Sequence, residues 1–91
     1  MEIVAYKIVY KKSVKKDLKS ISEETKYLIR RAIEEKLIDD PVKFGLPLRK
    51  TLKGYMKLRV GDYRVIYSVK KKTITVHVIK IGDRKDVYKK V

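Results

Sequence analysis

The 91-residue sequence predicts an α+β fold with the element order β-α-α-β-β-β, in which two helices pack on one face of an antiparallel meander sheet. Three observations support this prediction. The first residues are β-branched and aromatic, the middle third repeats apolar residues at helical spacing, and the last third alternates apolar and polar residues. The sequence shows no repeat and no low-complexity segment, so we expect residues 1–91 to form a single domain around one modest core.

The first expected strand spans Glu2–Tyr10, whose sequence EIVAYKIVY favours extended structure. Ser13 is a suitable N-cap for a short helix that follows. One face of this helix carries Val14, Leu18 and Ile21 at helical spacing. The chain is therefore expected to begin with a strand and a short amphipathic helix.

A second helix is expected to begin after Ser22 and to run to Leu37 or Ile38. Ser22 can cap this helix, and Glu23 and Glu24 in its first turn suit the positive end of the helix dipole. The expected apolar face consists of Leu28, Ile29, Ala32, Ile33 and Leu37. This face and that of the first helix are expected to cover the apolar side of the sheet.

The segment after the second helix is expected to be mostly irregular. Asp39-Asp40-Pro41 ends the helix, because proline disfavours helical structure in the residue before it. Pro41–Pro47 is expected to be a loop. Leu48–Lys53 is expected to be irregular or a short edge strand, since Pro47 argues against a central strand. Gly54 then lets the chain turn into the meander.

The meander is organised around a hairpin between Tyr55 and Tyr67. Gly61-Asp62 suits a two-residue type II′ turn, which has glycine at its first position. This turn places Val60 opposite Tyr63, Arg59 opposite Arg64, Leu58 opposite Val65 and Lys57 opposite Ile66. One face then carries Met56, Leu58, Val60, Tyr63, Val65 and Tyr67, and the other carries Lys57, Arg59 and Arg64. Because like charges opposite one another destabilise a hairpin, this cationic face suggests a polyanion as the partner.

The last strand is expected over Thr73–Ile81, after a turn at Lys71-Lys72. This turn predicts that Val69 faces Ile74, Tyr67 faces Val76, Val65 faces Val78, Arg64 lies beside Ile79 and Ile66 lies beside His77. The core face would thus continue without a register break, and the cationic face would stay open. A longer loop is the alternative, because a turn without glycine is poor hairpin chemistry.

Charge is the strongest signal of the whole sequence. The net charge is +14 and the sequence pI is about 10.0, which favours RNA, DNA or an acidic protein as the partner. The sequence has no cysteine and one histidine, so we expect no disulfide, no metal and no cofactor. It has no long apolar run and no signal-peptide pattern, so we expect a cytoplasmic protein without membrane contact. Lys, Glu and Ile are abundant while Asn and Gln are absent, which fits a thermophilic source.

Arg84 and Tyr88 follow the last expected strand and can face the same hollow as Arg64. The planar fork of arginine binds two phosphate oxygens at once. Cleavage of RNA without metal requires deprotonation of the 2′-hydroxyl, stabilisation of the phosphorane charge and protonation of the leaving 5′-oxygen. On the residues alone, catalysis and simple phosphate binding remain equal alternatives. His77, a lone histidine in a strand, is more simply structural.

Two segments, LRKTLKGYMKLRVGDYRVIYSV and VIKIGDRKDVY, resemble the RelE/ParE superfamily of bacterial and archaeal toxins, in particular the RelE branch. The resemblance covers nearly the whole chain and implies a RelE-like fold. It implies the toxin of a type II toxin–antitoxin system, a ribosome-dependent endoribonuclease that cuts mRNA in the ribosomal A site through the 2′-hydroxyl. The implied partners are the ribosome, mRNA and a RelB-like antitoxin. The alternatives are a non-catalytic gyrase inhibitor, as in the ParE branch, and a basic RNA-binding module.

The resemblance also implies the site residues. The catalytic set would be Arg64, Arg84, Tyr88 and Lys57, and the RNA-binding set would be Lys53, Arg59, Lys50 and Arg49. Arg64 and Arg84 would stabilise the phosphate and the transition state, and Arg84 could protonate the leaving oxygen. Tyr88 would orient or activate the nucleophile and stack on a base, while Lys57 would contact or deprotonate at the scissile phosphate. A second family lysine, two residues before Lys57, is replaced here by Tyr55, so the identity of the base stays open.

Overall fold

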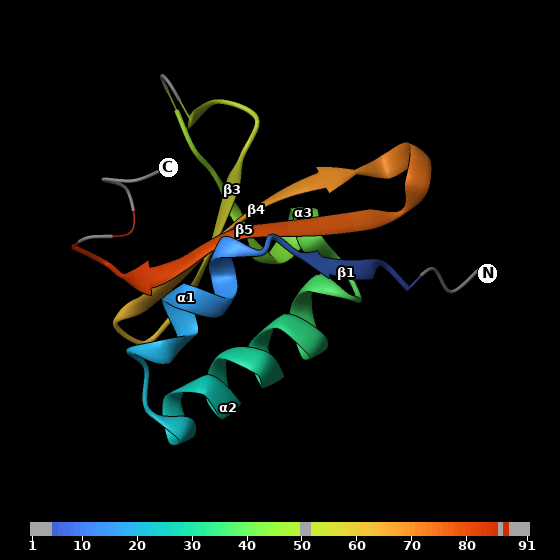
Figure 1. The fold of residues 1–91 in the computed structure, drawn as a ribbon. Coiled ribbons are helices and arrows are strands. Elements are labelled where there is room, and N and C mark those ends of the chain that lie inside the picture. Colours follow the sequence, from blue (N-terminus) through green and yellow to red (C-terminus); the bar gives the residue numbers. More distant parts are fainter. Residues whose placement is uncertain (1–4, 50–51, 86, 88–91) are drawn as a thin grey trace.

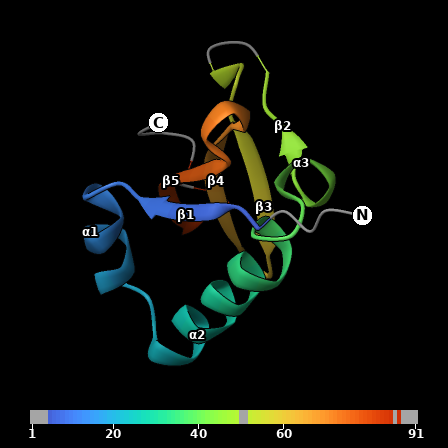
Figure 2. The ribbon, with the colours of Figure 1, turned by 90° about the vertical axis from the view of Figure 1, so that its right-hand side faces the viewer.

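The computed structural model describes residues 5–49, 52–85 and 87 of the chain. Its elements are β1 (Lys7–Tyr10), α1 (Ser13–Lys19), α2 (Glu23–Ala32), the π-helical turn η1 (Ile33–Leu37), α3 (Pro41–Phe44), β2 (Leu46–Pro47), β3 (Met56–Val60), β4 (Tyr63–Lys70), the 3-10 turn η3 (Lys71–Thr73) and β5 (Thr75–Asp83). The strands form a five-stranded sheet in the order β1-β5-β4-β3-β2, with α1 and α2 on one side (Figure 1, Figure 2). The predicted α+β class is therefore confirmed. No helix among the described residues is long and apolar enough to cross a membrane.

The sheet is mixed. The strands β3, β4 and β5 form the predicted antiparallel meander. In addition, β1 lies parallel to β5 and β2 lies antiparallel to β3. The parallel pair was not predicted, because strands so far apart in sequence carry no local signal of which edge they will join.

The core lies between the sheet and the helical elements α1, α2 and η1. Its buried members are Val14, Ile21, Ile29, Ile33, Leu37, Leu58, Val65, Tyr67, Val76, Val78 and Ile81. Most of the residues predicted for the apolar faces of the helices and the hairpin contribute to this cluster or pack against it. One prediction was wrong: Leu28 is 52% exposed, because the contact with the sheet is centred on Ile29 and Ile33, one and five residues later.

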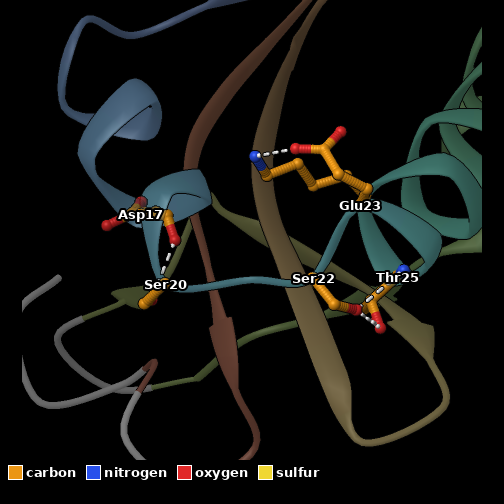
Figure 3. A network of polar contacts seen from close by, with 6 residues as sticks. Asp17, Ser20, Ser22, Glu23 and Thr25 are labelled. Atoms are coloured by element: carbon orange, nitrogen blue, oxygen red, sulfur yellow. Dashed lines mark hydrogen bonds and ion pairs between the residues drawn. The ribbon is translucent and has the colours of Figure 1, made fainter.

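The helix starts follow local chemistry. Ser22 accepts a hydrogen bond from the backbone N–H of Thr25 at 3.2 Å, which confirms it as the N-cap of α2 (Figure 3). In contrast, the predicted cap of α1 is wrong. Lys12 occupies the N-cap without a side-chain hydrogen bond, and Ser13 is the first helical residue.

The segment Pro41–Pro47, predicted to be a loop, contains α3 and β2. Asp40 accepts a hydrogen bond from the backbone N–H of Lys43 at 3.0 Å, and Pro41 occupies the first turn of α3. An Asp-Pro pair is therefore both the end of one helix and the start of the next. The edge strand falls at Leu46–Pro47, which is two residues before the earliest position considered from the sequence, Leu48.

The β3–β4 hairpin has the predicted register. Val60 lies opposite Tyr63, and Arg59 lies opposite Arg64. Gly61 has a φ of +58° while Asp62 is not among the residues with positive φ, as expected for a type II′ turn. Gly54, with a φ of +99°, makes the predicted turn into β3.

The β4–β5 register differs from the prediction. The connection is longer than Lys71-Lys72, since η3 is followed by Ile74 in the left-handed conformation. Consequently Val69 lies opposite Val76, Tyr67 opposite Val78, Ile66 opposite Lys80, Val65 opposite Ile81 and Arg64 opposite Gly82. The step from Val78 to Lys80 leaves Ile79 as a β-bulge, so the predicted continuous register and the predicted neighbours of Arg64 and Ile66 are wrong.

Candidate active site on the cationic face

The backbones of three arginines lie around the Gly61-Asp62 turn. Arg59 and Arg64 are directly opposite one another on β3 and β4. Arg84 follows the end of β5, and its backbone N–H donates to the Asp62 carbonyl at 2.8 Å. The structure therefore brings Arg84 to the same end of the sheet as Arg59 and Arg64.

The side chain of Arg64 is held in place by its own turn. Its Nη1 donates to the carbonyl oxygens of Gly61 and Tyr63, each at 2.9 Å. Within the described part of the chain, its Nε and Nη2 make no hydrogen bond that would compete with a ligand. Because a guanidinium can bind two oxygens in its plane, this fixed fork is suited to a phosphate.

Lys57 lies on the same face as Arg59, two residues earlier on β3. It is half-buried between its strand neighbours Leu46 and Ile66. Burial of its stem would limit the positions of its ammonium group. The structure thus places Lys57 in the row next to Arg59 and Arg64, along the same face.

The predicted RNA-binding residues do not all gather in one place. Arg49 and Lys53 are exposed in the connection between β2 and β3, at the opposite end of β3 from the Gly61-Asp62 turn. Arg59 is exposed at the turn itself. Lys50 and Tyr88, both predicted site residues, lie outside the described residues. The described cations therefore form a track along β3, with Arg59, Arg64 and Arg84 at the end that has the Gly61-Asp62 turn and Arg49 and Lys53 near the other end.

The cationic face is partly covered, contrary to the prediction that it stays open. Val87 is fully buried, and its side chain lies where a Cβ on Gly82 would meet it at 3.4 Å. Since Gly82 is paired with Arg64, Val87 covers the face on which Arg64 lies. Two hydrogen bonds to Asp83 turn the chain back so that Val87 reaches this face. The Asp83 carboxylate accepts from the Lys85 N–H at 2.8 Å, and the Asp83 carbonyl accepts from the Val87 N–H at 2.9 Å. An Asp followed by a short polar turn and an apolar residue is the sequence signal that was missed.

His77 is not brought to the arginines. It is half-buried in β5 between Val9 of β1 and Ser68 of β4. Ser68 lies four residues from Arg64 along β4, a separation of about 13 Å in an extended strand. The structural interpretation of His77 fits this position, and no group of three His, Asp or Glu residues in the described ranges could hold a metal.

A separate groove lies on the helical side of the sheet. It has a volume of about 480 Å³, and its apolar lining includes Tyr10, Val14, Leu18 and Ile33. Lys15, Lys26 and Arg30 add positive charge to its wall. Burial, and to a lesser extent the nearby Glu34, raise the pKa of the Tyr10 phenol above its ordinary value, against a smaller opposing effect of Arg30. This hollow is distinct from the cationic face.

The known proteins to which this chain is similar include toxins of toxin–antitoxin systems. Residues 8–88 match the family described as ParE toxin of type II toxin-antitoxin system, parDE. The chain is similar to toxin RelE of Mycobacterium tuberculosis, with 29% identity over 92% of this chain and 87% of RelE. It is also similar to toxin RelG of the same organism, with 33% identity, but that match spans 56% of this chain and only 59% of RelG. The crystal structure of the M. tuberculosis toxin-antitoxin complex RelBE2 superimposes with a TM-score of 0.84 and 25% identity, covering 93% of this chain and 98% of that one.

Proposed function

Because the chain belongs to the family of ParE toxins of type II toxin–antitoxin systems, we propose that its cationic face is the active site of a ribosome-dependent endoribonuclease. The substrate is mRNA in the ribosomal A site, and the nucleophile is the 2′-hydroxyl next to the scissile phosphate. The observation that carries this proposal is the fixed guanidinium of Arg64, directly opposite Arg59 and beside the turn to which Arg84 is bonded.

The proposed chemistry uses charge rather than a metal. Attack of the 2′-hydroxyl creates a phosphorane whose extra negative charge needs stabilisation in a site that excludes water. Arg64, with Nη1 already fixed by the turn, offers its remaining donors to the phosphate oxygens without further ordering. Arg84 stabilises the same charge and protonates the leaving 5′-oxygen. The bond to the 5′-oxygen then breaks and a 2′,3′-cyclic phosphate is left.

The base that removes the 2′-hydroxyl proton is proposed to be Lys57. Lys57 lies on the same face of the hairpin as Arg59 and Arg64, two residues before Arg59 on β3, and it is the described amine of that face nearest in the register to both arginines. Tyr88, which lies outside the described residues, is proposed to orient the nucleophile and to stack on a nucleobase of the mRNA.

The proposed partners are the ribosome with its mRNA and a cognate antitoxin, all in the cytoplasm. The similar RelBE2 structure is a toxin-antitoxin complex, which supports an antitoxin partner. A chain with 25 basic and 11 acidic residues is best neutralised by an acidic or amphipathic segment. Covering Arg64 and Arg84, or displacing the segment that holds Tyr88, would each block the proposed site.

The test is a cleavage assay on ribosomes programmed with a defined mRNA, comparing wild type with Arg64→Ala and Arg84→Ala. We expect cuts within the A-site codon by wild type and a loss of about 100-fold or more in rate for each variant, as for removal of an oxyanion donor. The matched control is Arg31→Ala, since Arg31 is an exposed arginine of α2 paired with Glu35 at 2.7 Å. This control should cut like wild type.

Two results would reject the proposed reaction. The first is that neither variant cuts more slowly than wild type. The second is that wild type binds ribosomes without cutting mRNA, which would favour a basic RNA-binding module. Inhibition of DNA gyrase supercoiling by such an inactive wild type would instead favour the non-catalytic activity of the ParE branch.

A further inference from the structure

Asp17 makes an unusual connection between α1 and the last strand. Its carboxylate is 8% exposed and accepts two hydrogen bonds from β5, 63 and 64 residues later in the chain. Oδ1 binds the ammonium of Lys80 at 2.7 Å, and Oδ2 binds the backbone N–H of Ile81 at 3.1 Å. Figure 3 shows Asp17 on α1, close to Ser20 at the end of that helix. A carboxylate this buried is stable only when both oxygens are satisfied, as they are here.

The position of Asp17 follows from where β1 ends. The pairing of β1 with β5 stops at Tyr10 and Val78, and the next backbone bond, from Lys11 N–H to the Val78 carbonyl at 2.9 Å, leads into α1. Beyond this point no strand of the described residues lies beside the edge of β5, so the N–H of Ile81 needs another acceptor. Asp17 supplies that acceptor and takes the place of the missing strand.

The two residues bound by Asp17 come directly after the bulge at Ile79. If β5 continued the register of the Tyr67–Val78 pair without a bulge, Lys80 would face Val65 in the core and Ile81 would lie beside Arg64. The bulge instead buries Ile81 in the core and places Gly82 opposite Arg64. It also sets the point at which β5 ends, where the Arg84 N–H meets the Asp62 carbonyl.

We propose that Asp17 is a positioning residue for the cationic site: by binding Lys80 and Ile81, it holds the bulge that sets Arg84 beside the turn that fixes Arg64. This role rests on the proposed endoribonuclease function for its effect on cleavage. Its effect on the backbone of Arg84 does not depend on that function. Asp17 belongs to α1 and binds the edge of β5, so its proposed effect on cleavage acts through the position of the β5 backbone.

The test is Asp17→Asn in the full chain, with two readouts. The first is hydrogen exchange of the Arg84 backbone amide, which we expect to become about tenfold faster or more as the local structure opens. The second is single-turnover cleavage on programmed ribosomes. There we expect the maximal rate to fall about tenfold or more while the half-saturating concentration changes little, because misplacement of a catalytic group lowers the rate of the chemical step.

Controls separate positioning from general stability. Glu35→Gln removes an exposed carboxylate paired with Arg31 at 2.7 Å and should change neither readout. The reference is the backbone amide of Ile33, which lies in the core. In Asp17→Asn, this amide should exchange at the rate set by global unfolding, whereas the Arg84 amide should exchange faster than that rate. Faster exchange at both amides in equal proportion would mean a purely structural role and would overturn the proposal.

The outcomes also separate this inference from the proposed function. If wild type cuts no mRNA, the endoribonuclease function fails, and the exchange of Arg84 alone decides the role of Asp17. Unchanged Arg84 exchange in folded Asp17→Asn overturns the positioning role whatever the cleavage result. If Asp17→Asn does not fold, Lys80→Met takes its place, since it removes the ion pair through which the proposal has Asp17 hold the residue directly after the bulge. Faster Arg84 exchange in Lys80→Met supports the role, and unchanged exchange overturns it.

Discussion

Tyr67 shows how a single side chain joins distant parts of the fold. It is fully buried, and its hydroxyl donates to the Pro41 carbonyl at 2.6 Å. Gly45 lies so close that a Cβ at this position would overlap the phenol oxygen and approach Cζ to 2.8 Å. The absence of a side chain at Gly45 is therefore a packing requirement. Tyr67 thereby fastens α3 to the central strand of the sheet.

Replacing Tyr67 by Phe should lower the free energy of unfolding by about 1–3 kcal/mol at neutral pH, because the Pro41 carbonyl loses its buried donor. Burial, with a smaller effect of Asp40, raises the pKa of the Tyr67 phenol well above its ordinary value of 10.0. The folded state therefore keeps the phenol neutral where the unfolded chain ionises it. This contribution is fully present below pH 10 and is lost as the pH rises from there toward the folded-state pKa.

Urea denaturation of wild type and Tyr67→Phe between pH 7 and pH 11 measures this effect. The stability difference between the two should be constant up to about pH 10 and should shrink above it, where only wild type carries the raised pKa. A difference that stays constant over the whole range would show that the phenol titrates alike in the folded and unfolded chains.

At the scale of the elements, local turn chemistry decided what could be predicted. The β3–β4 hairpin was predicted pair by pair because glycine at Gly61 permits only a short, defined turn, and this turn fixes the register. The opposition of Arg59 and Arg64 follows from the same register. No glycine marks the β4–β5 connection, so its true length could not be read from the sequence.

The remaining features of the site depend on contacts between distant residues. The sequence TVHVIKI of β5 is apolar at many positions on both faces, so its pattern does not reveal the bulge at Ile79. The parallel neighbour β1 and the Asp17 bonds both join segments that no local pattern connects. The sequence predicted from strand order that Arg84 lies near Arg64. It did not predict the bulge at Ile79 or the Asp17 bonds beside it.

The β4–β5 connection contains the only non-glycine residue with positive φ among the described residues. Ile74 has a φ of +49° and is 40% exposed, and its carbonyl accepts the Lys7 N–H at 2.9 Å. A β-branched residue in this conformation costs about 1–2 kcal/mol. Ile74→Gly should therefore raise the free energy of unfolding by about 0.5–1 kcal/mol, after the greater freedom of glycine in the unfolded chain is subtracted.

Thermal and urea denaturation would measure the change. The matched control is Thr73→Gly, one residue earlier in the same exposed connection and without positive φ. It should destabilise the protein, since glycine there gains freedom only in the unfolded chain. Equal destabilisation by both variants would mean that Ile74 is not strained.

At the scale of the whole molecule, the sheet separates two surfaces with different chemistry. The helical side contains the core and the groove lined by Tyr10, Val14 and Ile33. The opposite side has the cationic track of β3 and the arginines at the Gly61-Asp62 turn. The net charge of +14 provides long-range attraction for any polyanion, whereas we expect the cations of the track to contact individual phosphates.

These two contributions can be separated by salt. Binding to single-stranded RNA should weaken steeply as salt rises, with a slope of log K against log salt near 0.7 for each phosphate neutralised. Arg59→Ala and Arg64→Ala should each reduce this slope by about 0.7, because each removes one phosphate contact. Fluorescence anisotropy of a labelled oligonucleotide over a range of salt concentrations gives the slopes.

The control for this experiment is again Arg31→Ala, which lowers the net charge by the same amount on the helical side of the sheet. If RNA binding depended on total charge alone, all three variants would lose the same slope. If it depends on the track, Arg31→Ala keeps the wild-type slope while the two hairpin variants lose theirs. The comparison thus tests whether the excess charge acts as a general attraction or through a surface built by the register of one hairpin.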